Sequence, residues 1–152
     1  MMDIRLFLAS LNEHDVRYVV IGALAFPHHG YARATLDVDV FIDAVAENAR
    51  RTRQALAATG FDVTELTVDD LLKFKVLIRQ YVLQVDVHPF VSGVDFVDVW
   101  SRSEVSQIEG VQVRVPCLED LIRMKEAAGR PKDLEDLKAL RQLRELGPDT
   151  TR

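Results

Sequence analysis

Apolar residues recur along this chain at the two spacings that distinguish helices from strands. Apolar positions three or four residues apart predict helices over residues 4–14, 44–59, 118–128 and 132–145. Runs rich in β-branched and aromatic residues predict strands over residues 17–21, 36–42, 61–64, 74–78 and 82–87. Shorter helical segments are expected at residues 23–28 and 68–72. Helices and strands therefore alternate along the first half of the chain.

Short turns separate two pairs of adjacent strands, which predicts hairpins. Residues 79–81 join the last two of the strands above, and Glu109-Gly110 joins two further strands at 103–108 and 111–115. A hairpin within a sheet that also contains helix-linked strands makes that sheet mixed. We therefore expect an α+β fold of α/β-like character, with a mixed sheet flanked by helices.

The length and composition fit one domain with an ordinary core. The chain has 152 residues, of which 48% are apolar. We expect the core over residues 1–115 and a helical segment over residues 116–152 packed on it. The net charge of −5 argues against binding nucleic acid through a broad basic surface, although a small basic groove remains open.

The single cysteine and the start of the chain bear on where the protein works. Cys117 is the only cysteine, so an internal disulfide and a cysteine metal cluster are both excluded. A reduced, cytoplasmic environment is the natural interpretation. The first residues contain no apolar run long enough for a signal peptide or a membrane span, so no membrane contact is expected.

Two aspartates interrupt the second predicted strand. Asp37 and Asp39 are two residues apart, so in a strand their side chains project from the same face, roughly 6–7 Å apart. Like charges at this distance repel unless solvent or a cation lies between them. A magnesium or manganese ion shared with substrate phosphates is the obvious partner, which indicates phosphoryl or nucleotidyl transfer. The alternative is that the pair merely decorates a solvent-exposed strand face.

These residues resemble a known superfamily. A glycine turn at Gly22-Ala23, the Asp37-x-Asp39 pair and a lone aspartate on a later strand are similar to polymerase-beta-type nucleotidyltransferases. The wider string and the C-terminal helical motif resemble the small bacterial AbiEii-like branch, at Ile21 to Ala25, His29-Gly30, Arg33, Thr35, Lys125, Arg130, Lys132, Asp133, Asp136 and Leu137. The resemblance covers roughly residues 15 to 140.

The resemblance implies a metal-dependent transfer of a nucleoside monophosphate from a nucleoside triphosphate (NTP) to a hydroxyl acceptor. The acceptor could be RNA such as tRNA, a protein or a small molecule, and a toxin–antitoxin role with a cognate toxin or antitoxin is possible. Asp37, Asp39 and Asp86 would hold Mg²⁺ or Mn²⁺, and Asp86 would also orient or deprotonate the acceptor hydroxyl. Gly22 would let the backbone approach phosphate, because it has no Cβ.

The remaining roles follow from the same resemblance. Ala23, Arg33, Thr35 and Arg130 would contribute to nucleotide binding, and Lys125 and Asp133 are implied in activity. The basic residues would clamp the transferring phosphates, or else form exposed ion pairs on a helix.

Two features of the sequence leave alternatives open. Ala23 stands where the family usually has glycine or serine, so a catalytically inactive antitoxin or binding module is the alternative to an enzyme. His28 and His29 make a poor metal cage because adjacent side chains do not face one way. His88 follows Asp86 by two residues and could reach the site from the same strand face.

Overall fold

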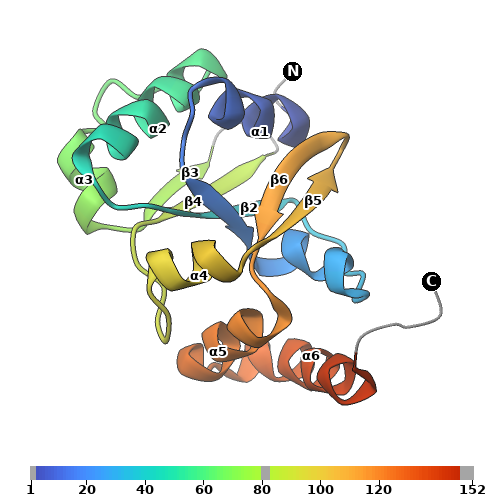
Figure 1. The fold of residues 1–152 in the computed structure, drawn as a ribbon. Helices are drawn as coiled ribbons and strands as arrows, with labels where there is room; N and C mark the ends of the chain where they lie inside the picture. The colour runs from blue at the N-terminus through green and yellow to red at the C-terminus, as the bar shows by residue number, and fades with distance from the viewer. Residues whose placement is uncertain (1–2, 80–82, 148–152) are drawn as a thin grey trace.

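The computed structural model describes residues 3–79 and 83–147, built around a four-stranded mixed sheet (Figure 1). The strand order is β1-β2-β4-β3, where β1 is antiparallel to β2, β2 is parallel to β4, and β3 is antiparallel to β4. The strands are β1 (Tyr18–Ile21), β2 (Asp37–Ile42), β3 (Val76–Arg79) and β4 (Gln84–His88). The predicted mixed sheet in an α+β fold is confirmed. The predicted 79–81 turn lies partly outside the described residues.

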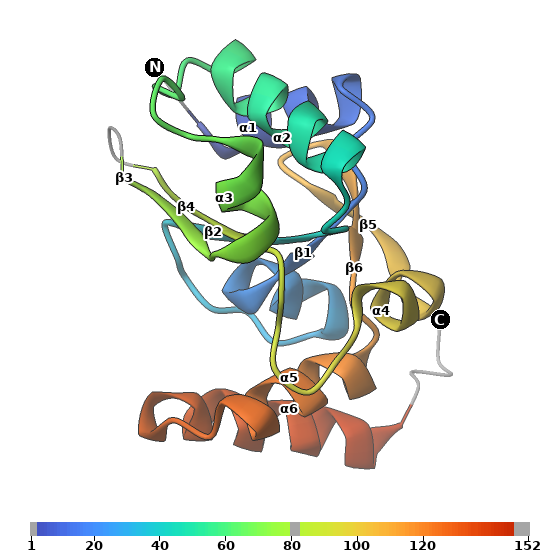
Figure 2. The same ribbon diagram turned by 90° about the vertical axis from the view of Figure 1, so that its left-hand side faces the viewer.

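Helices cover both faces of the sheet (Figure 2). One face carries α1 (Ile4–Glu13), α2 (Ala46–Ala58) and α3 (Val68–Lys73). The other face carries the 3₁₀ helix η1 (Gly22–His29) and, beyond it, α5 (Leu118–Ala128), η2 (Pro131–Asp133) and α6 (Leu134–Leu146). A short helix and a hairpin complete the fold: α4 (Phe96–Arg102), β5 (Glu104–Ile108) and β6 (Val111–Val115). None of the described helices is long and apolar enough to cross a bilayer.

A single apolar cluster joins the sheet to both helix layers. Phe7 of α1, Phe41 of β2, Ile122 of α5 and Leu140 of α6 all belong to it and are at most 1% exposed. Burial of such side chains stabilises a fold by about 1.5–3 kcal/mol each. The C-terminal helices thus share the core of the sheet, and the division at residues 115 and 116 stays a prediction.

One predicted strand is wrong and one helix was missed. Residues 61–64 form no strand: the carbonyl oxygen of Val63 accepts a hydrogen bond from the side chain of Arg53 instead of from a neighbouring strand. Phe61 still packs edge-on against Phe7 in the core, which explains its apolar signal. The helix α4 was not predicted, since its seven residues are too few for a periodic pattern to stand out.

A tight loop after β4 is fixed against α5. Gly93 has a φ of +87°, which side chains rarely adopt, and a Cβ at this position would lie 2.7 Å from Cβ of Ala127 and 3.1 Å from the carbonyl oxygen of Arg123. The loop therefore needs glycine for both its conformation and its close approach. This contact keeps the segment after β4 close to the C-terminal helices.

A Gly93→Ala substitution is expected to lower the free energy of unfolding by more than a positive φ alone would, because the new Cβ also clashes with α5. Gly110 is the matched control, because its φ is +80° but nothing lies within 4 Å of a Cβ built there. Gly110→Ala should cost about 1 kcal/mol of unfolding free energy, and Gly93→Ala about 2–3 kcal/mol. Urea unfolding measures both. Equal losses in the two variants would show that the loop does not press on α5.

Candidate active site

Two of the predicted aspartates face each other across parallel strands. Asp39 of β2 and Asp86 of β4 are register partners, and their side chains are 24% and 16% exposed. Asp37 lies two residues earlier on the same strand, opposite Gln84, and is exposed. Residues two apart on a strand share a face, so all three carboxylates belong to one side of the sheet. The backbone register therefore brings the predicted acidic residues together.

The turn after β1 lies directly against one of these carboxylates. Ile21 is the register partner of Asp39, and the next residue, Gly22, has a φ of +71°. A Cβ at Gly22 would lie only 2.7 Å from Oδ2 of Asp39. Glycine is thus required both by the left-handed backbone and by the position of the carboxylate. The η1 helix begins at this glycine, so its first free N–H groups lie next to the acidic residues.

Two further side chains complete the acidic cluster. Nε2 of His88 lies 2.9 Å from Oδ1 of Asp39, and Nη1 of Arg79 donates to Oδ1 of Asp86 at 2.7 Å. That hydrogen bond raises the pKa of Arg79. Ligand atoms of Asp39, Asp86 and His88 all lie within 4.8 Å of one another. Carboxylate oxygens and an imidazole nitrogen at this separation fit a divalent cation.

A cavity of about 360 Å³ adjoins Asp39 and separates it from the C-terminal helices. Gly22 and His88 line this cavity from the sheet and its first turn, and Lys125 and Arg130 line it from the C-terminal helical segment. Other described residues lining it include Phe26, Lys75, Phe90, Val91, Ser92, Leu121 and Met124. The cavity therefore brings the carboxylate of Asp39 together with the cations of Lys75, Lys125 and Arg130.

Two of the cations at the cavity, Lys125 and Arg130, are held by two buried carboxylates. Nζ of Lys125 lies 3.1 Å from Asp133 and 3.2 Å from Asp136, and Arg130 donates to Asp133 at 2.7 Å. Asp136 also accepts hydrogen bonds from Arg33 and from the hydroxyl of Tyr31. Three cations and two anions leave this ion cluster with a net positive charge.

Hydrogen bonding keeps the most buried of these acids ionised. Asp133 is 2% exposed, and burial alone would raise its pKa. Hydrogen bonds from Arg130 and Lys125 outweigh burial and lower the pKa of Asp133 to about 2. The carboxylate is therefore charged at neutral pH and anchors Lys125 at the cavity wall.

The structure places the other predicted residues as follows. Arg33 and Asp133 lie in the ion cluster, where their contacts are with protein side chains. Oγ1 of Thr35 accepts a hydrogen bond from the backbone N–H of Asp37, so it shapes the entry to β2. Ala23 lies in the first turn of η1. The catalytic and binding roles of all these residues stay predictions.

Several residues of the site were not predicted from the sequence. Arg79 reaches Asp86 only because β3 pairs with β4, which no local pattern specifies. Lys75 and Phe90 lie at the cavity, and Phe90 is 66% exposed although it is a large apolar residue. The sequence did indicate one further neighbour of the site. His88 follows Asp86 by two residues on β4, so the alternation of side chains along a strand places both on the same face.

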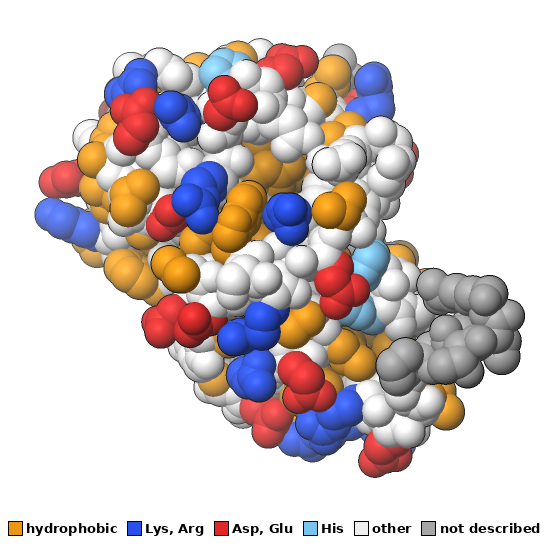
Figure 3. Space-filling view, in the orientation of Figure 1, with side chains coloured by type: hydrophobic (Ala, Val, Ile, Leu, Met, Phe, Trp, Pro, Cys, Tyr) orange, Lys and Arg blue, Asp and Glu red, His pale blue; other side chains and the backbone are white. Residues whose placement is uncertain are grey.

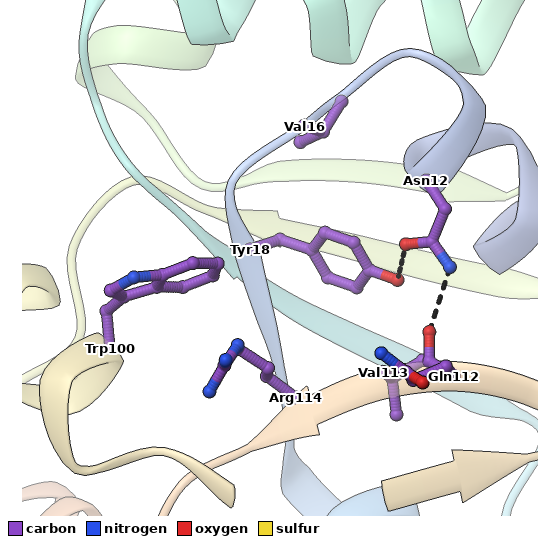
Figure 4. A pocket seen from close by; sticks show the side chains of 7 residues that line it. All are labelled: Asn12, Val16, Tyr18, Trp100, Gln112, Val113 and Arg114. Atoms are coloured by element: carbon purple, nitrogen blue, oxygen red, sulfur yellow. Dashed lines mark hydrogen bonds between the residues drawn. The ribbon is translucent and has the colours of Figure 1, made fainter. Parts of the chain in front are cut away.

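A second cavity, of about 320 Å³, lies near the opposite end of β1 (Figure 4). The hydroxyl of Tyr18 donates to Oδ1 of Asn12, and Nδ2 of Asn12 donates to the carbonyl oxygen of Gln112. Burial raises the pKa of Tyr18, so its hydroxyl remains a donor. The guanidinium of Arg114 lies 5.1 Å from the ring centre of Trp100. None of the described residues lining this cavity is acidic, so it does not compete as a cation site.

The histidine pair at the end of η1 has an acidic neighbour. Nε2 of His28 lies 3.0 Å from Oε1 of Glu104, and Nε2 of His29 lies 2.8 Å from the carbonyl oxygen of Pro116. Pale-blue histidine atoms next to an acidic side chain are visible at the edge of the face in Figure 3. Tertiary structure thus supplies a partner that the sequence analysis did not find, and both rings are held by hydrogen bonds.

Comparison with known proteins identifies the family. Residues 1–147 match the family described as a nucleotidyltransferase of unknown function, DUF6036. The chain belongs to this family. A search of curated proteins found no match. The AbiEii-like branch is therefore not the family that the comparison finds, although both are nucleotidyltransferase-like.

Two solved structures share the fold. The antibiotic-resistance factor ANT(2'')-Ia, known from its solution structure, is 18% identical with a TM-score of 0.65, covering 95% of this chain and 82% of that chain. A Thermotoga maritima protein, TM1012, described as a candidate nucleotidyltransferase, is 19% identical with a TM-score of 0.56, covering 91% of this chain and 88% of that chain. These similarities show a nucleotidyltransferase-like fold.

Removing Arg79 should strengthen cation binding at the acidic cluster. The Arg79 guanidinium competes for Asp86, so Arg79→Gln frees one carboxylate oxygen. We expect the affinity for Mn²⁺ without nucleotide to rise about five-fold, or about 1 kcal/mol. Calorimetric titration measures it, with Arg50→Gln as the control because Arg50 pairs with Glu47 on the exposed face of α2. An unchanged or weaker affinity in Arg79→Gln would contradict this competition.

Replacing Asp133 by asparagine should lower stability in a pH-dependent way. The pKa of Asp133 is below its ordinary value of 3.8, so its ionised form stabilises the fold above about pH 4, and this contribution is lost as the pH falls towards 2. Asp133→Asn should cost about 2 kcal/mol at pH 7, and the difference should shrink between pH 4 and 2.

Urea unfolding at several pH values measures this effect. Asp69→Asn is the control, since Asp69 forms an exposed pair with Lys73 and should contribute less than about 1 kcal/mol. A difference between Asp133→Asn and the wild type that stays constant down to pH 2 would show that the carboxyl charge is not what stabilises this position.

Proposed function

We propose that the protein is a metal-dependent nucleotidyltransferase that moves a nucleoside monophosphate from an NTP to a hydroxyl group and releases pyrophosphate. The observation that carries this proposal is one cavity that combines a carboxylate with cations. Asp39 lines it next to the Gly22 turn, and Lys75, Lys125 and Arg130 line it as well. A metal–triphosphate complex has matching charges, with a cation for the carboxylate and a chain of negative oxygens for the basic side chains.

The acidic residues would work at the reacting phosphate. Asp37, Asp39 and Asp86 would hold Mg²⁺ or Mn²⁺, which neutralises charge on the phosphate oxygens in the transition state. Asp86 would also orient the acceptor hydroxyl and accept its proton while the acceptor oxygen attacks the α-phosphorus in line with the leaving pyrophosphate. For this, Arg79 must release the Asp86 oxygen to which it donates.

The rest of the cavity would bind the nucleotide. The open N–H groups at the start of η1 lie next to Asp39 and suit phosphate oxygens. Lys125 and Arg130 would contact the β- and γ-phosphates that become pyrophosphate. The exposed ring of Phe90 offers a surface on which a base can stack. Arg33 and Asp133 would act indirectly, by holding the cluster that positions Lys125.

We favour a hydroxyl group of a small molecule or of a protein, rather than of RNA, as the acceptor. Basic and acidic side chains are interspersed on the face in Figure 3, without a continuous basic surface, and the chain carries a net charge of −5. The fold is also that of ANT(2'')-Ia, an antibiotic-resistance factor. The resemblance of the C-terminal motif to the AbiEii-like branch keeps a toxin–antitoxin context within the proposal, with a cognate toxin or antitoxin as the partner.

Labelled NTPs test the reaction directly. The full chain is incubated with each NTP carrying ³²P at the α- or γ-phosphate, together with Mg²⁺ or Mn²⁺, total RNA, lysate protein and small-molecule extracts. We expect label from the α-phosphate in an acceptor and label from the γ-phosphate in pyrophosphate. Asp39→Asn and Asp86→Asn should reduce transfer by about 100-fold or more.

The control variant removes a carboxylate outside the site. Asp98 is exposed on α4, so Asp98→Asn should transfer label at the wild-type rate. Label from the γ-phosphate in an acceptor would contradict nucleotidyl transfer and show that the protein transfers a phosphoryl group instead. A chain that binds NTP and metal but gives no product with any acceptor fraction would favour the inactive binding-module alternative.

A further inference from the structure

We propose that His88 is a direct ligand of the metal ion at the active site, and that it makes the site prefer a first-row transition ion such as Mn²⁺ over Mg²⁺. The inference deepens the proposed function, because it concerns the metal with which that reaction would run. It rests on the positions of three side chains on two strands.

The ligand atoms converge because of the strand register. Asp86 and His88 are two residues apart on β4 and share a face, and Asp39 lies opposite Asp86 on β2. Nε2 of His88 is 2.9 Å from Oδ1 of Asp39, and ligand atoms of the three residues lie within 4.8 Å of one another. Asp37 is absent from this group of described residues, and its register partner is Gln84, two pairs away from the pair of Asp39 and Asp86.

The hydrogen bond to Asp39 defines how the ring would change on binding a metal. A carboxylate oxygen only accepts, so Nε2 of His88 carries the proton in this contact. For a cation to take the place of that proton, the neutral ring would carry its single proton on Nδ1 and offer the Nε2 lone pair. Asp39 would keep a charged partner, since it would hold the same cation.

The surroundings of His88 favour this role. Its side chain is 16% exposed and lines the cavity shared with Gly22 and Lys125. Asp86, the third residue of the group, forms an ion pair with Arg79. The guanidinium thus places a positive charge next to the carboxylates, as a bound cation would. An orienting hydrogen bond to Asp39 alone is the competing explanation, and it would leave the imidazole outside the coordination shell.

An imidazole ligand changes which ion is preferred. Mg²⁺ takes oxygen ligands in a strict octahedron and keeps much of its water, so a nitrogen ligand adds little to its affinity. First-row transition ions accept imidazole readily, and their affinities for mixed nitrogen and oxygen sites are higher. An imidazole ligand beside the carboxylates should therefore separate Mn²⁺ from Mg²⁺ more than carboxylates alone would.

Electron paramagnetic resonance of bound Mn²⁺ tests the ligand itself. Spin-echo spectra of the full chain with Mn²⁺, recorded without nucleotide and with a non-hydrolysable NTP analogue, should show modulation from a directly bound ¹⁴N nucleus. His88→Ala should remove this modulation and weaken Mn²⁺ binding about ten-fold or more, while Mg²⁺ binding, measured by competition, changes by less than about three-fold.

Two further variants make the result specific. His88→Asp should bind metal without nitrogen modulation and shift the preference towards Mg²⁺, which also covers the case in which His88→Ala does not fold. His28→Ala disrupts the other histidine–glutamate group and should leave the nitrogen signal unchanged, which places Mn²⁺ at the active site.

The outcomes separate this inference from the proposed reaction. Mn²⁺ bound without ¹⁴N modulation, modulation that persists in His88→Ala, or no Mn²⁺ binding under either condition would each overturn the role of His88. Nucleotidyl transfer in a chain without the nitrogen signal would leave the proposed function standing. A nitrogen signal in a chain that transfers no nucleotide would support His88 as a ligand and contradict the proposed function.

Discussion

Repulsion between carboxylates on the two central parallel strands is the constraint on which the site depends. Asp39 and Asp86 are register partners, so the sheet fixes their backbones side by side and both side chains start from the same face. The structure meets this charge with a guanidinium from Arg79 and a hydrogen bond from His88. Because Gly22 has no Cβ, the turn after β1 can lie against the same carboxylate. These contacts leave a cluster that a divalent cation would stabilise further.

The C-terminal helices provide the opposite charge by a buried ion cluster. Asp133 and Asp136 are almost completely buried and would be costly to ionise alone, yet they hold Lys125, Arg130 and Arg33. The family resemblance predicts that these cations contact phosphate, whereas their observed partners are protein carboxylates. Both contacts are compatible. The carboxylates would fix Lys125 and Arg130 at the cavity, and phosphate oxygens would contact the parts of these two side chains that line it.

Prediction from sequence succeeded where a local pattern decides the structure. The period of two placed Asp37 and Asp39 on one strand face, and β-branched runs located the strands of the sheet. It failed at residues 61–64, where Arg53 satisfies backbone carbonyls from a distance of ten or more residues. It also missed Arg79, whose contact with Asp86 depends on the pairing of β3 with β4. Long-range pairing is the common cause.

Apart from the strand at 61–64 and the helix α4, the sequence alone determined the order of helices and strands, the acidic pair and the glycine turn, since these depend on residues close together in the chain. Only the tertiary structure decided that β2 and β4 are neighbours, which sets Asp39 opposite Asp86 and brings His88 to the same carboxylate. It also decided that the loop at Gly93 packs on α5, and that Asp39, Lys125 and Arg130 line one cavity. Such contacts arise from packing between distant segments, and no local preference of the backbone encodes them.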